Sequence, residues 1–518
     1  MRIHLINPSH ISFGMAVITP RWPYVLADAT PRSFGDPLIV DETLEPFDPA
    51  GIEAGDVVGI SIHTGNALRG YEVGRMVRER GAQVVFGGIH ATLYPDEAHE
   101  RGGAHAVVKG DGDGIWPQVL HDCVAGAPAP FYDGGKVPGG SLRKARWDLL
   151  PRQHYMWASV QTVRGCPKHC SFCSVWRTDG QEPRQRTTDA VVEEIVELRR
   201  MGFRFIALAD DNFYPVTLED LAMAKRREDP SRLRELEELR AERFDLMARL
   251  ARLPSDTILF TQITMEAAED TAFLQAMHDA RIRGALIGVE SVSEAGLQDV
   301  YKGFNLSGDA LVSRLQEFKR HGVHVLGSFI FGLPSDQPDS FRSTAALAQQ
   351  ADIDFAQFIT LTPFPGTVDF QKWERTEATA AQQVDGVPLS RYWLIPQAVR
   401  PKVFSPHPAM TSEDIRTGTQ SAWDQFYSLP SIWRRSATVK SLKGRLSYLL
   451  VSKLYRQMYA NTGIATDSAR VSRAAAWARL LARPLHRLFA GRPMPDLQVP
   501  GPQPVTPDTT AAQPQPLM

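Results

Sequence analysis

The stretch RGCPKHCSFC, residues 164–173, packs three of the chain's four cysteines into eight positions. Cys166, Cys170 and Cys173 follow a CxxxCxxC spacing on what we expect to be a tight loop. Structural zinc sites and ordinary cubane iron–sulfur sites take four protein ligands. Three thiolates at this spacing therefore indicate a cubic iron–sulfur cluster that is held at three corners and keeps one iron open.

Zinc bound by the three cysteines and His169 is the alternative for this motif. His169 lies between two of the cysteines on a short loop, where pointing at the same metal ion is sterically awkward. The fourth cysteine, Cys123, lies far upstream, and we expect it to be an ordinary core or helix residue. One closely spaced trio and one distant cysteine cannot form a disulfide framework for a chain of this length.

Length and composition indicate a chain with two or three domains. It has 518 residues, of which 43% are hydrophobic and 22% charged, and its formal net charge of −2 carries no global signature of nucleic-acid binding. No run approaches the roughly 18 to 20 continuous apolar residues of a membrane span, and the apolar part of the first residues is too short for a secretory signal. We expect a cytoplasmic protein, since a reducing compartment preserves an exposed low-potential cluster.

Residues 1–130 alternate short apolar runs with helical stretches, which predicts a doubly wound α/β sheet of parallel strands. The expected strands cover residues 3–6, 37–40, 57–62, 83–86 and 106–108. Ligands of such sheets bind beyond the carboxyl ends of the strands, where glycines let backbone approach a large ligand and threonines donate hydrogen bonds. The candidate binding residues are Thr64, Gly87, Gly88, Thr92 and Gly110. No G-x-G-x-x-G opens a helix after the first strand, which disfavours nicotinamide binding.

After a Gly/Pro-rich connector, residues 145–370 repeat a strand–helix pattern. The expected strands cover residues 160–163, 205–208, 258–263, 285–289, 323–330 and 355–361. Six such units with right-handed crossovers predict a (β/α)6 partial barrel with its site at the carboxyl ends of the strands. Polar residues follow two of these strands: Asp210 and Asp211 follow the second, and Glu290 and Ser291 follow the fourth. The Asp pair can also be a helix N-cap or a divalent-metal site, and Glu290 a buried salt-bridge partner.

The cysteine spacing and the order of these groups resemble the radical S-adenosylmethionine (SAM) superfamily. The resemblance covers about residues 145–370. It implies a [4Fe–4S] cluster on the three clustered cysteines, whose open iron binds the methionine moiety of SAM, and reductive cleavage of SAM to a 5′-deoxyadenosyl radical. An electron donor such as flavodoxin or ferredoxin is implied as a partner.

The same resemblance implies which residues contact SAM. Asp210 and Asp211 hold the place of the polar groups that receive the amino group of SAM. Glu290 and Ser291 hold a place associated with its ribose and methionine portions. The segment 327–334 resembles the one that packs on adenine, and there Gly332 serves backbone geometry.

Placed before such a core, the first domain resembles the cobalamin-binding domain of the cobalamin-dependent (class B) radical SAM enzymes. The resemblance rests on residues 87–95 (GGIHATLYP) and 108–113 (VKGDGD), and it implies cobalamin as a further cofactor. The chain lacks the D-x-H-x-x-G motif by which cobalamin mutases supply an axial histidine. We therefore expect His63 and His90, on ligand-facing loops, to be hydrogen-bonding or packing residues rather than cobalt ligands.

Residues 38–44, 62–70 and 173–177, together with the basic C-terminal end, look like the bacterial hopanoid C-3 methylase group. That resemblance implies a radical SAM C-methyltransferase that methylates an unactivated carbon, C-3 of the A ring of a hopanoid lipid bound between the two domains. One alternative is a cobalamin-dependent radical SAM enzyme that methylates or oxidatively cyclises another lipid or natural product. A non-catalytic iron–sulfur protein is the alternative from another class.

Residues 371–492 are predicted to be mainly helical and basic. Residues 434–492 hold thirteen Lys or Arg and one acid, Asp467, among apolar residues. Such helices can lie on the anionic inner face of the cytoplasmic membrane, or they can pack their apolar side on the barrel. Nucleic-acid binding is disfavoured because no reading module accompanies the charge. Residues 493–518 hold eight prolines in 26 residues and are predicted to be disordered.

Overall fold

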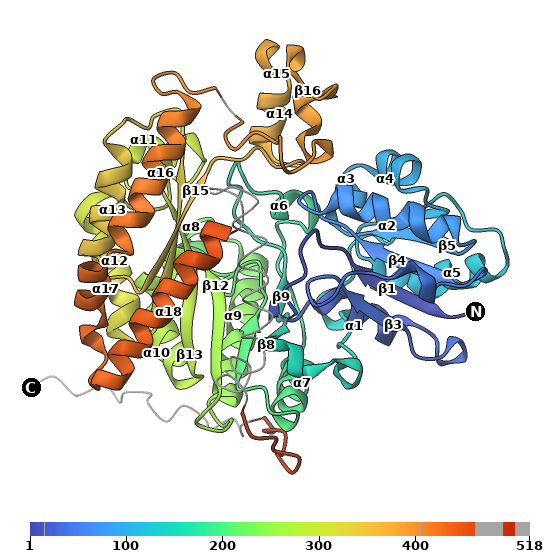
Figure 1. The fold of residues 1–518 in the computed structure, drawn as a ribbon. Helices are drawn as coiled ribbons and strands as arrows, with labels where there is room; N and C mark the ends of the chain where they lie inside the picture. Colours follow the sequence, from blue (N-terminus) through green and yellow to red (C-terminus); the bar gives the residue numbers. More distant parts are fainter. Residues whose placement is uncertain (15, 405, 462–490, 503–518) are drawn as a thin grey trace, which may run out of the picture.

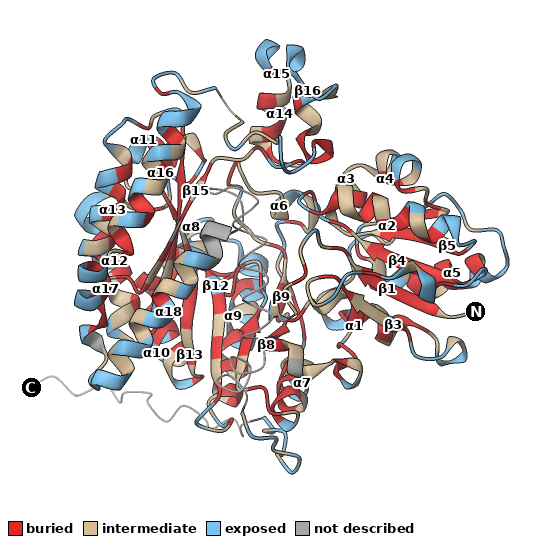
Figure 2. Cartoon of the chain, viewed as in Figure 1, coloured by how far each residue is buried: buried red, intermediate tan, exposed pale blue. Residues whose placement is uncertain are grey.

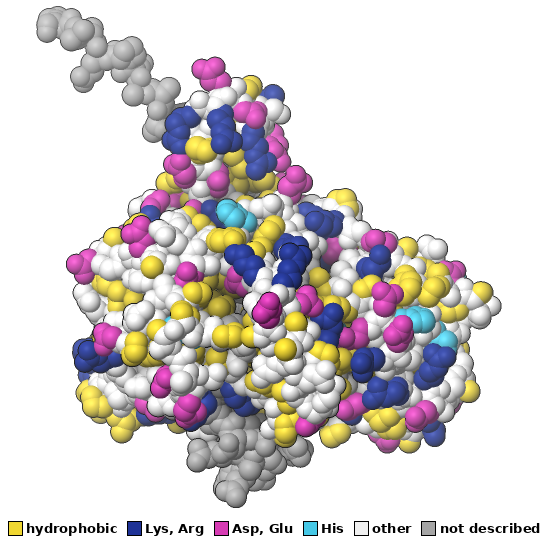
Figure 3. Space-filling view, turned by 90° about the horizontal axis from the view of Figure 1, so that it is seen from above, with side chains coloured by type: hydrophobic (Ala, Val, Ile, Leu, Met, Phe, Trp, Pro, Cys, Tyr) yellow, Lys and Arg dark blue, Asp and Glu magenta, His cyan; other side chains and the backbone are white. Residues whose placement is uncertain are grey.

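The computed structural model describes residues 1–14, 16–404, 406–461 and 491–502. Two sheets form its framework and lie side by side, the first in blue and the second in teal to yellow (Figure 1). Buried residues concentrate on the strands and on the inner faces of the helices (Figure 2). Within the described ranges, no helix combines the length and the apolar character that a membrane crossing needs. On the face seen in Figure 3, acidic and basic side chains are interspersed with hydrophobic ones.

The first sheet has six parallel strands in the order β3-β1-β4-β5-β6-β7. Their bounds are β1 (Ile3–Asn7), β3 (Leu38–Asp41), β4 (Val57–Ser61), β5 (Gln83–Gly87), β6 (Ala106–Lys109) and β7 (Phe131–Asp133). Helices cover both faces because alternate residues of each strand point to opposite sides. Ile3 and Leu5 share a core with α1 (Arg21–Ala29) and α5 (Gly112–Val124). Ile6 and Ile60 share the other with α2 (Ala67–Glu79) and α4 (Pro95–Gly102), so the predicted doubly wound sheet is confirmed.

The second sheet has seven parallel strands in the order β15-β14-β13-β12-β11-β8-β2. Five of them match predicted strands of the partial barrel: β11 (Phe205–Leu208), β12 (Ile258–Ile263), β13 (Ile282–Glu290), β14 (His324–Phe331) and β15 (Phe355–Thr360). The first barrel strand, β8 (Tyr155–Val160), lies before the predicted range 160–163 and shares only Val160 with it. Successive parallel strands are joined through helices that cover the sheet, among them α7 (Thr188–Arg200), α9 (Pro230–Leu250), α10 (Thr271–Asp279), α12 (Gly308–Arg320) and α13 (Ser340–Gln350). The seventh strand was not predicted: β2 (Ala16–Ile18) comes from the N-terminal segment and pairs with β8.

The region after the barrel divides between the two sheets. Its first part, which we call the cap, spans residues 368–395 and contains α14 (Val368–Glu374), α15 (Glu377–Ala381) and the hairpin β16 (Gln383–Val384) and β17 (Val387–Pro388). The cap shares a core with the first domain, through Phe370, Trp373 and Trp393. The second part packs on the barrel as α16 (Ser412–Phe426), α17 (Leu429–Arg435) and α18 (Leu442–Asn461). The predicted helical region thus contains a small hairpin and contacts both domains.

The start of the proline-rich tail lies against the barrel, where disorder was predicted. The N–H of Met494 donates to the carbonyl of Arg200 at 3.2 Å, and Arg249 Nε donates to the carbonyl of Pro500 at 2.9 Å. Arg249 is buried and its guanidinium needs acceptors, which the carbonyl of Pro500 and the carboxylate of Asp189 supply. The rest of the predicted disordered tail, residues 503–518, and most of the predicted basic region, residues 462–490, lie outside the described residues.

Candidate active site

The three clustered cysteines lie on the loop between β9 (Val163–Arg164) and α6 (Val175–Thr178), beyond the carboxyl end of β8. Backbone hydrogen bonds tie this loop to its surroundings. The N–H of Cys166 donates to the carbonyl of Gly180 at 3.1 Å, and the N–H of Ser171 donates to the carbonyl of Val300, also at 3.1 Å. The N–H of Cys173 donates to the carbonyl of Cys170 at 3.2 Å, which curls the chain between these two ligands.

The thiols of this loop lie in a largely desolvated place. Burial raises the pKa of Cys166 to about 11 and that of Cys173 to about 12, and it raises the pKa of Cys170 as well. The backbone N–H groups of Lys168 and Val175 point at the sulfurs of Cys166 and Cys173 and oppose this shift of the pKa. Protons are therefore retained on the free thiols, and bound metal is what converts them to thiolates.

Asp210 holds the polypeptide that leads into the cysteine loop. Its Oδ1 accepts the N–H groups of Thr162 at 2.5 Å and Val163 at 2.9 Å, and its Oδ2 accepts the hydroxyl of Thr162 at 2.6 Å. The side chain is buried, and burial raises its pKa while the neighbouring Arg243 guanidinium lowers it. Both carboxylate oxygens are used within the protein, so the geometry gives Asp210 a positioning role in place of the expected contact with SAM.

Asp211 points at the cysteine loop itself. Its Oδ2 accepts the N–H of Gly165 at 2.6 Å, one residue before Cys166. Unlike its neighbour it is partly exposed, and burial together with the charge of Asp179 raises its pKa to about 6. Of the predicted Asp pair, Asp211 is the member that remains available to a bound molecule.

Glu290 ends β13 and forms a buried ion pair. Its Oε1 lies 2.8 Å from Nζ of Lys302, which also donates to the carbonyl of Gly288 at 2.7 Å. The positive φ of 65° at Glu290 turns the chain out of the strand. Among the charges near Cys170, that of Lys302 has the largest effect and lowers the pKa of the thiol against the effect of burial. The alternative of a buried salt-bridge partner is thus confirmed for Glu290, and its contact with SAM stays a prediction.

The remaining predicted SAM residues lie in turns that follow β13 and β14. Ser291 Oγ accepts the N–H of Ser293 at 3.2 Å at the start of α11 (Glu294–Asp299). Gly332 has a φ of +83°, and its N–H donates to Asp336 Oδ2 at 2.9 Å. This conformation disfavours a side chain, so the expected role of Gly332 in backbone geometry is confirmed.

A carboxylate of the first domain joins it to the cysteine loop. Asp111 Oδ1 lies 2.6 Å from Arg164 Nη1, and its Oδ2 lies 2.5 Å from Arg184 Nη1. The Arg164 charge is the largest of the favourable interactions that hold the pKa of Asp111 below its ordinary value, against the opposing effect of burial. The carboxyl edge of the first sheet therefore faces the start of the cysteine loop.

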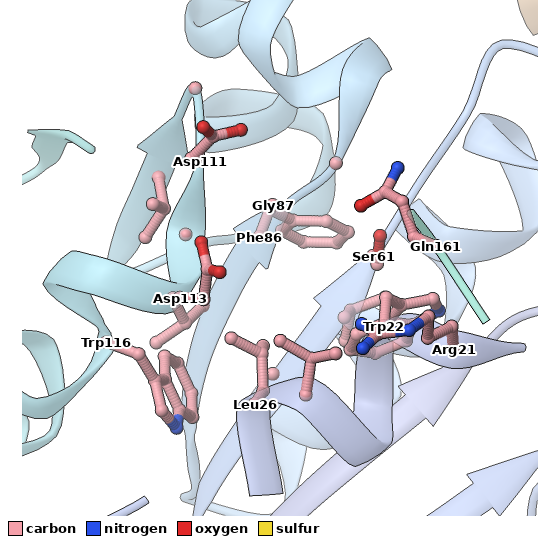
Figure 4. A pocket seen from close by; sticks show the side chains of 18 of the residues that line it. Arg21, Trp22, Leu26, Ser61, Phe86, Gly87, Asp111, Asp113, Trp116 and Gln161 are labelled. Carbon is pink, nitrogen blue, oxygen red and sulfur yellow. The ribbon is translucent and has the colours of Figure 1, made fainter. Parts of the chain in front are cut away.

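A cavity of about 320 Å³ opens at this junction, at the carboxyl ends of β4, β5 and β6 (Figure 4). Its floor comes from the first domain and includes the predicted residues Gly87, Gly88 and Gly110. A Cβ on Gly88 would lie 2.6 Å from the carbonyl of Ile62, so the close approach of these loops requires glycine there. The barrel contributes Gln161, Arg164 and Ala209 to the lining, so the cavity lies between the two domains.

Two residues that were predicted to contact a ligand make hydrogen bonds within the protein. Thr92 Oγ1 donates to the carbonyl of Gly88 at 3.0 Å and accepts the N–H of Gly110 at 3.1 Å, which ties two glycine loops together. Thr64 Oγ1 lies 3.2 Å from Nδ1 of the buried His90. Neither threonine lines the cavity. The expected hydrogen bonds from Thr64 and Thr92 to a ligand are thus replaced by bonds within the protein, and His90 is a hydrogen-bonding residue as predicted.

Comparison with known proteins agrees with this geometry. Residues 160–348 match the family model described as the radical SAM superfamily. These residues form a radical SAM domain. The predicted fold is confirmed: a radical SAM partial barrel lies beside a doubly wound domain and is followed by helices. The prediction of a radical SAM enzyme that uses a [4Fe–4S] cluster and SAM is also confirmed.

Three curated relatives align with larger parts of the chain. An uncharacterized methyltransferase of Pyrococcus horikoshii is 26% identical and covers 76% of this chain and 82% of its own length. The bacteriochlorophyllide d C-8(2)-methyltransferase of Chlorobaculum tepidum is 24% identical over 62% of this chain and 69% of its own length. The hopanoid C-2 methylase of Rhodopseudomonas palustris is 23% identical over 43% of this chain and 40% of its own length.

Two solved structures share the fold. TsrM from Kitasatospora setae, a radical SAM methyltransferase with cobalamin and a [4Fe–4S] cluster bound, has a TM-score of 0.60 at 15% identity and covers 88% of this chain and all of its own. The cobalamin-dependent radical SAM enzyme OxsB, with aqua-cobalamin bound, has a TM-score of 0.63 at 12% identity and covers 96% of this chain and 77% of its own. At these identities the likeness concerns the fold.

The residues of the radical SAM domain fit a cluster held at three corners. In the described part of the chain, no three His, Cys, Asp or Glu side chains converge on one metal ion. His169 has an exposed side chain, which argues against zinc held by this histidine together with the three cysteines. Cys123 is buried in the core of the first domain, as expected. The three sulfurs supply soft donors for iron on one restrained loop.

Two residues of the site escaped the sequence reasoning. Lys302 follows α11 and becomes part of the site only because the chain folds its amine against Glu290. Asp113 lines the cavity, is 5% exposed, and its Oδ2 has no hydrogen-bond partner among the described residues. Figure 4 shows its carboxylate at the cavity. The GDGD run at residues 110–113 was the available signal for Asp113, whereas no local pattern marks Lys302.

Proposed function

We propose that the chain is a cobalamin-dependent radical SAM methyltransferase that acts on an unactivated carbon. The observation that carries this proposal is the cavity between the domains: glycine loops of a doubly wound sheet line it on one side, and the segment leading into the cysteine loop lines it on the other. The names of the relatives support methyl transfer, since two of the three reported above are called methyltransferases and the third a methylase. The fold shared with two cobalamin-binding enzymes supports cobalamin.

Each cofactor has a set of residues suited to it. The cluster would be held by the three cysteines of the loop, and SAM by Asp211, Glu290, Ser291 and the turn at Gly332. Cobalamin would use the backbone of Gly87, Gly88 and Gly110. It would also use Oδ2 of Asp113, which has no partner among the residues that the structure describes and can accept a hydrogen bond from a hydroxyl or amide group. When bound, the cluster and SAM supply a radical that removes hydrogen from carbon, and cobalamin supplies the methyl group. The protein orients these groups and excludes water.

For the substrate we propose a hopanoid lipid methylated at C-3 of its A ring. The resemblance of residues 38–44, 62–70 and 173–177 to the hopanoid C-3 methylase group supports it, and a relative named hopanoid C-2 methylase shows that hopanoid methylation occurs among the relatives of this chain. A tetrapyrrole is the second candidate, because bacteriochlorophyllide methyltransferases align with a larger share of the chain than the hopanoid enzyme does. A flavodoxin or ferredoxin would serve as electron donor.

The experiment is anaerobic reconstitution with iron, sulfide and cobalamin, followed by incubation with SAM, a reductant and diploptene. We expect 5′-deoxyadenosine, S-adenosylhomocysteine and a product heavier by one CH2. Deoxyadenosine without S-adenosylhomocysteine or added mass would overturn methyl transfer and favour oxidative chemistry, such as that of a relative named anaerobic magnesium-protoporphyrin IX monomethyl ester cyclase. Turnover only with a bacteriochlorophyllide would overturn the proposal that the substrate is a hopanoid.

Matched cysteine variants separate catalysis from a non-catalytic iron–sulfur role. Replacing Cys166, Cys170 or Cys173 by Ala should abolish SAM cleavage and the cluster absorbance, whereas Cys123→Ala, in the core of the first domain, should retain both. Deoxyadenosine formation by any of the three loop variants would contradict the cluster assignment. A wild-type cluster that never cleaves SAM would support the non-catalytic class.

A further inference from the structure

Helix α18 carries apolar residues on two faces, and the residues that the structure describes leave one of these faces exposed. On the inner face, Tyr448, Leu449 and Tyr455 pack against the main core of the barrel. The opposite face carries four leucines at intervals of four residues. Leu442, Leu446, Leu450 and Leu454 have exposed fractions of 65%, 54%, 57% and 45%. Residues spaced in this way lie along one side of a helix, so the four leucines form a continuous line that we call the leucine stripe.

The surroundings of the leucine stripe are cationic. Residues 434–461 hold no Asp or Glu and seven Lys or Arg, of which Arg435 is buried and Arg456 forms an ion pair with Asp424. Lys440 and Lys443 lie where α18 begins and are exposed, and neither has a carboxylate partner among the residues described. Val451, 44% exposed, lies beside the stripe and widens the apolar strip. An exposed apolar line beside amines that have no carboxylate partner in the described part of the chain marks an interaction site.

We propose that the leucine stripe, with Lys440 and Lys443, is a docking surface for an anionic lipid bilayer. A helix of this kind lies in the plane of the headgroups, with its apolar side in the acyl boundary and its amines at the lipid phosphates. Tyr448 fixes the helix on the barrel, since its hydroxyl donates to the carbonyl of Asp354 at 2.8 Å. The helix therefore presents the stripe without leaving the protein, and the whole enzyme is held at the membrane surface.

The charges favour a bilayer over the two other occupants of such a surface. Residues 462–490 of the same chain hold five Arg and one Asp, so this segment would bring positive charge onto a positive surface. A second copy that packed stripe against stripe would face the same repulsion. Anionic headgroups instead neutralise the amines while the acyl region takes up the leucines. This inference does not depend on the identity of the substrate or on the proposed methyl transfer.

The test is co-sedimentation of the full chain with vesicles of phosphatidylcholine, with and without phosphatidylglycerol. We expect binding to the anionic vesicles, weakened by salt, and little binding to phosphatidylcholine alone. The double variant Leu446→Asp, Leu450→Asp should bind the anionic vesicles at least about tenfold more weakly than the wild type. The double variant Lys440→Gln, Lys443→Gln should bind them about tenfold more weakly, because each amine near an anionic surface adds attraction. The matched control is Leu218→Asp, an exposed leucine at the start of α8 (Leu218–Arg226), which should bind as the wild type does.

Circular dichroism and thermal unfolding of each variant show that the fold is retained, as expected for changes on an exposed face. Absence of binding by the wild type, or full binding by the Leu446→Asp, Leu450→Asp variant, would overturn the proposal. Light scattering tests whether a second copy of the chain occupies the stripe. A wild-type dimer that becomes a monomer in the Leu446→Asp, Leu450→Asp variant would also overturn the proposal. A chain with the wild-type leucines that binds vesicles only after residues 462–490 are deleted would show that this segment, and not lipid, covers the stripe.

Discussion

Asp111 of the first domain lies 2.6 Å from Arg164, the residue that opens the cysteine stretch, as measured between Oδ1 and Nη1. The second oxygen of the same carboxylate lies 2.5 Å from Arg184 and accepts the N–H of Val137 at 2.7 Å. One side chain thus joins the sheet that lines the cavity to both strands of a small ladder formed by β9 and β10 (Arg184–Gln185), in which Arg184 pairs with Arg164. Because the three charged groups are mostly buried, removing one leaves the others without compensation.

The variant Asp111→Asn should lower the free energy of unfolding by about 3 kcal/mol, since it keeps the volume but removes the charge between two arginines. It should also weaken cobalamin retention, measured from the absorbance of the reconstituted protein after gel filtration. The matched control is Asp133→Asn, whose exposed side chain lies 3.6 Å from Lys109 and should contribute less than about 1 kcal/mol. Equal effects of the two variants in urea unfolding would contradict a joining role for Asp111.

The same carboxylate predicts a pH dependence. The pKa of Asp111 is lower in the folded protein than its ordinary value near 4, so its contribution to stability is present above that value. The contribution is lost as the pH falls through the lowered pKa. The difference in unfolding free energy between wild type and Asp111→Asn should therefore be constant above about pH 5 and shrink below about pH 4. A difference that grows on acidification would show that Asp111 is not held as a carboxylate.

The strands that line the site could be predicted from sequence because each buried strand carries its own apolar run. The short strand β2 could not, since Val17 and Ile18 are exposed and the strand exists only through pairing with β8, far along the chain. The packing of the cap could not be predicted from the sequence either. Its aromatic residues indicate a core, but no local pattern tells which of the two domains they cover.

The residues of the candidate site also include some that the sequence could predict and some that it could not. The cysteines were predictable because a cluster needs its ligands at close spacing on one loop, and Gly332 because a positive φ favours glycine. Asp210 was expected to face SAM, yet its carboxylate is consumed by Thr162 and Val163, a use that depends on how two strand ends meet. Lys302 enters the site through tertiary contact alone.

The contact between the cap and the first domain predicts the effect of Trp393→Phe. The indole Nε1 of Trp393 donates to Glu97 Oε1 at 2.8 Å, an oxygen that also accepts the hydroxyl of Tyr71 at 2.9 Å. A hydrogen bond to a charged acceptor contributes about 1.5 to 3 kcal/mol, so the variant should lose about this much unfolding free energy. Trp433→Phe, at a 40% exposed tryptophan of α17, is the control and should change stability by less than about 1 kcal/mol.

Hydrogen exchange locates the effect of the cap variant. Amides of α2, α3 (Ile89–Leu93) and α4 should exchange faster in Trp393→Phe, while those of β11 to β13 in the barrel should not change, because the lost bond belongs to the core shared by the cap and the first domain. Uniform acceleration over both domains would instead mean that the two unfold as one unit and that the cap does not act through the first domain.

The amine of Lys302 predicts a change in the redox chemistry of the site. Its charge is buried beside Glu290 and near the sulfurs of Cys170 and Cys166. A nearby positive charge favours the reduced, more negative state of a cluster held there. Lys302→Met removes that charge and leaves Glu290 unpaired, so the cluster should become harder to reduce. An interaction of about 1 to 2 kcal/mol corresponds to a midpoint potential lower by on the order of 60 mV for one electron.

The conservative variant Lys302→Arg keeps the charge and serves as the control. Redox titration followed by electron paramagnetic resonance should give it a midpoint close to that of the wild type, while Lys302→Met shifts to lower potential with its iron content unchanged. If Lys302 acted only by holding the turn after α11, both variants would lose iron and neither would shift the potential of the cluster that remains. A shift confined to Lys302→Met therefore separates an electrostatic role from a structural one.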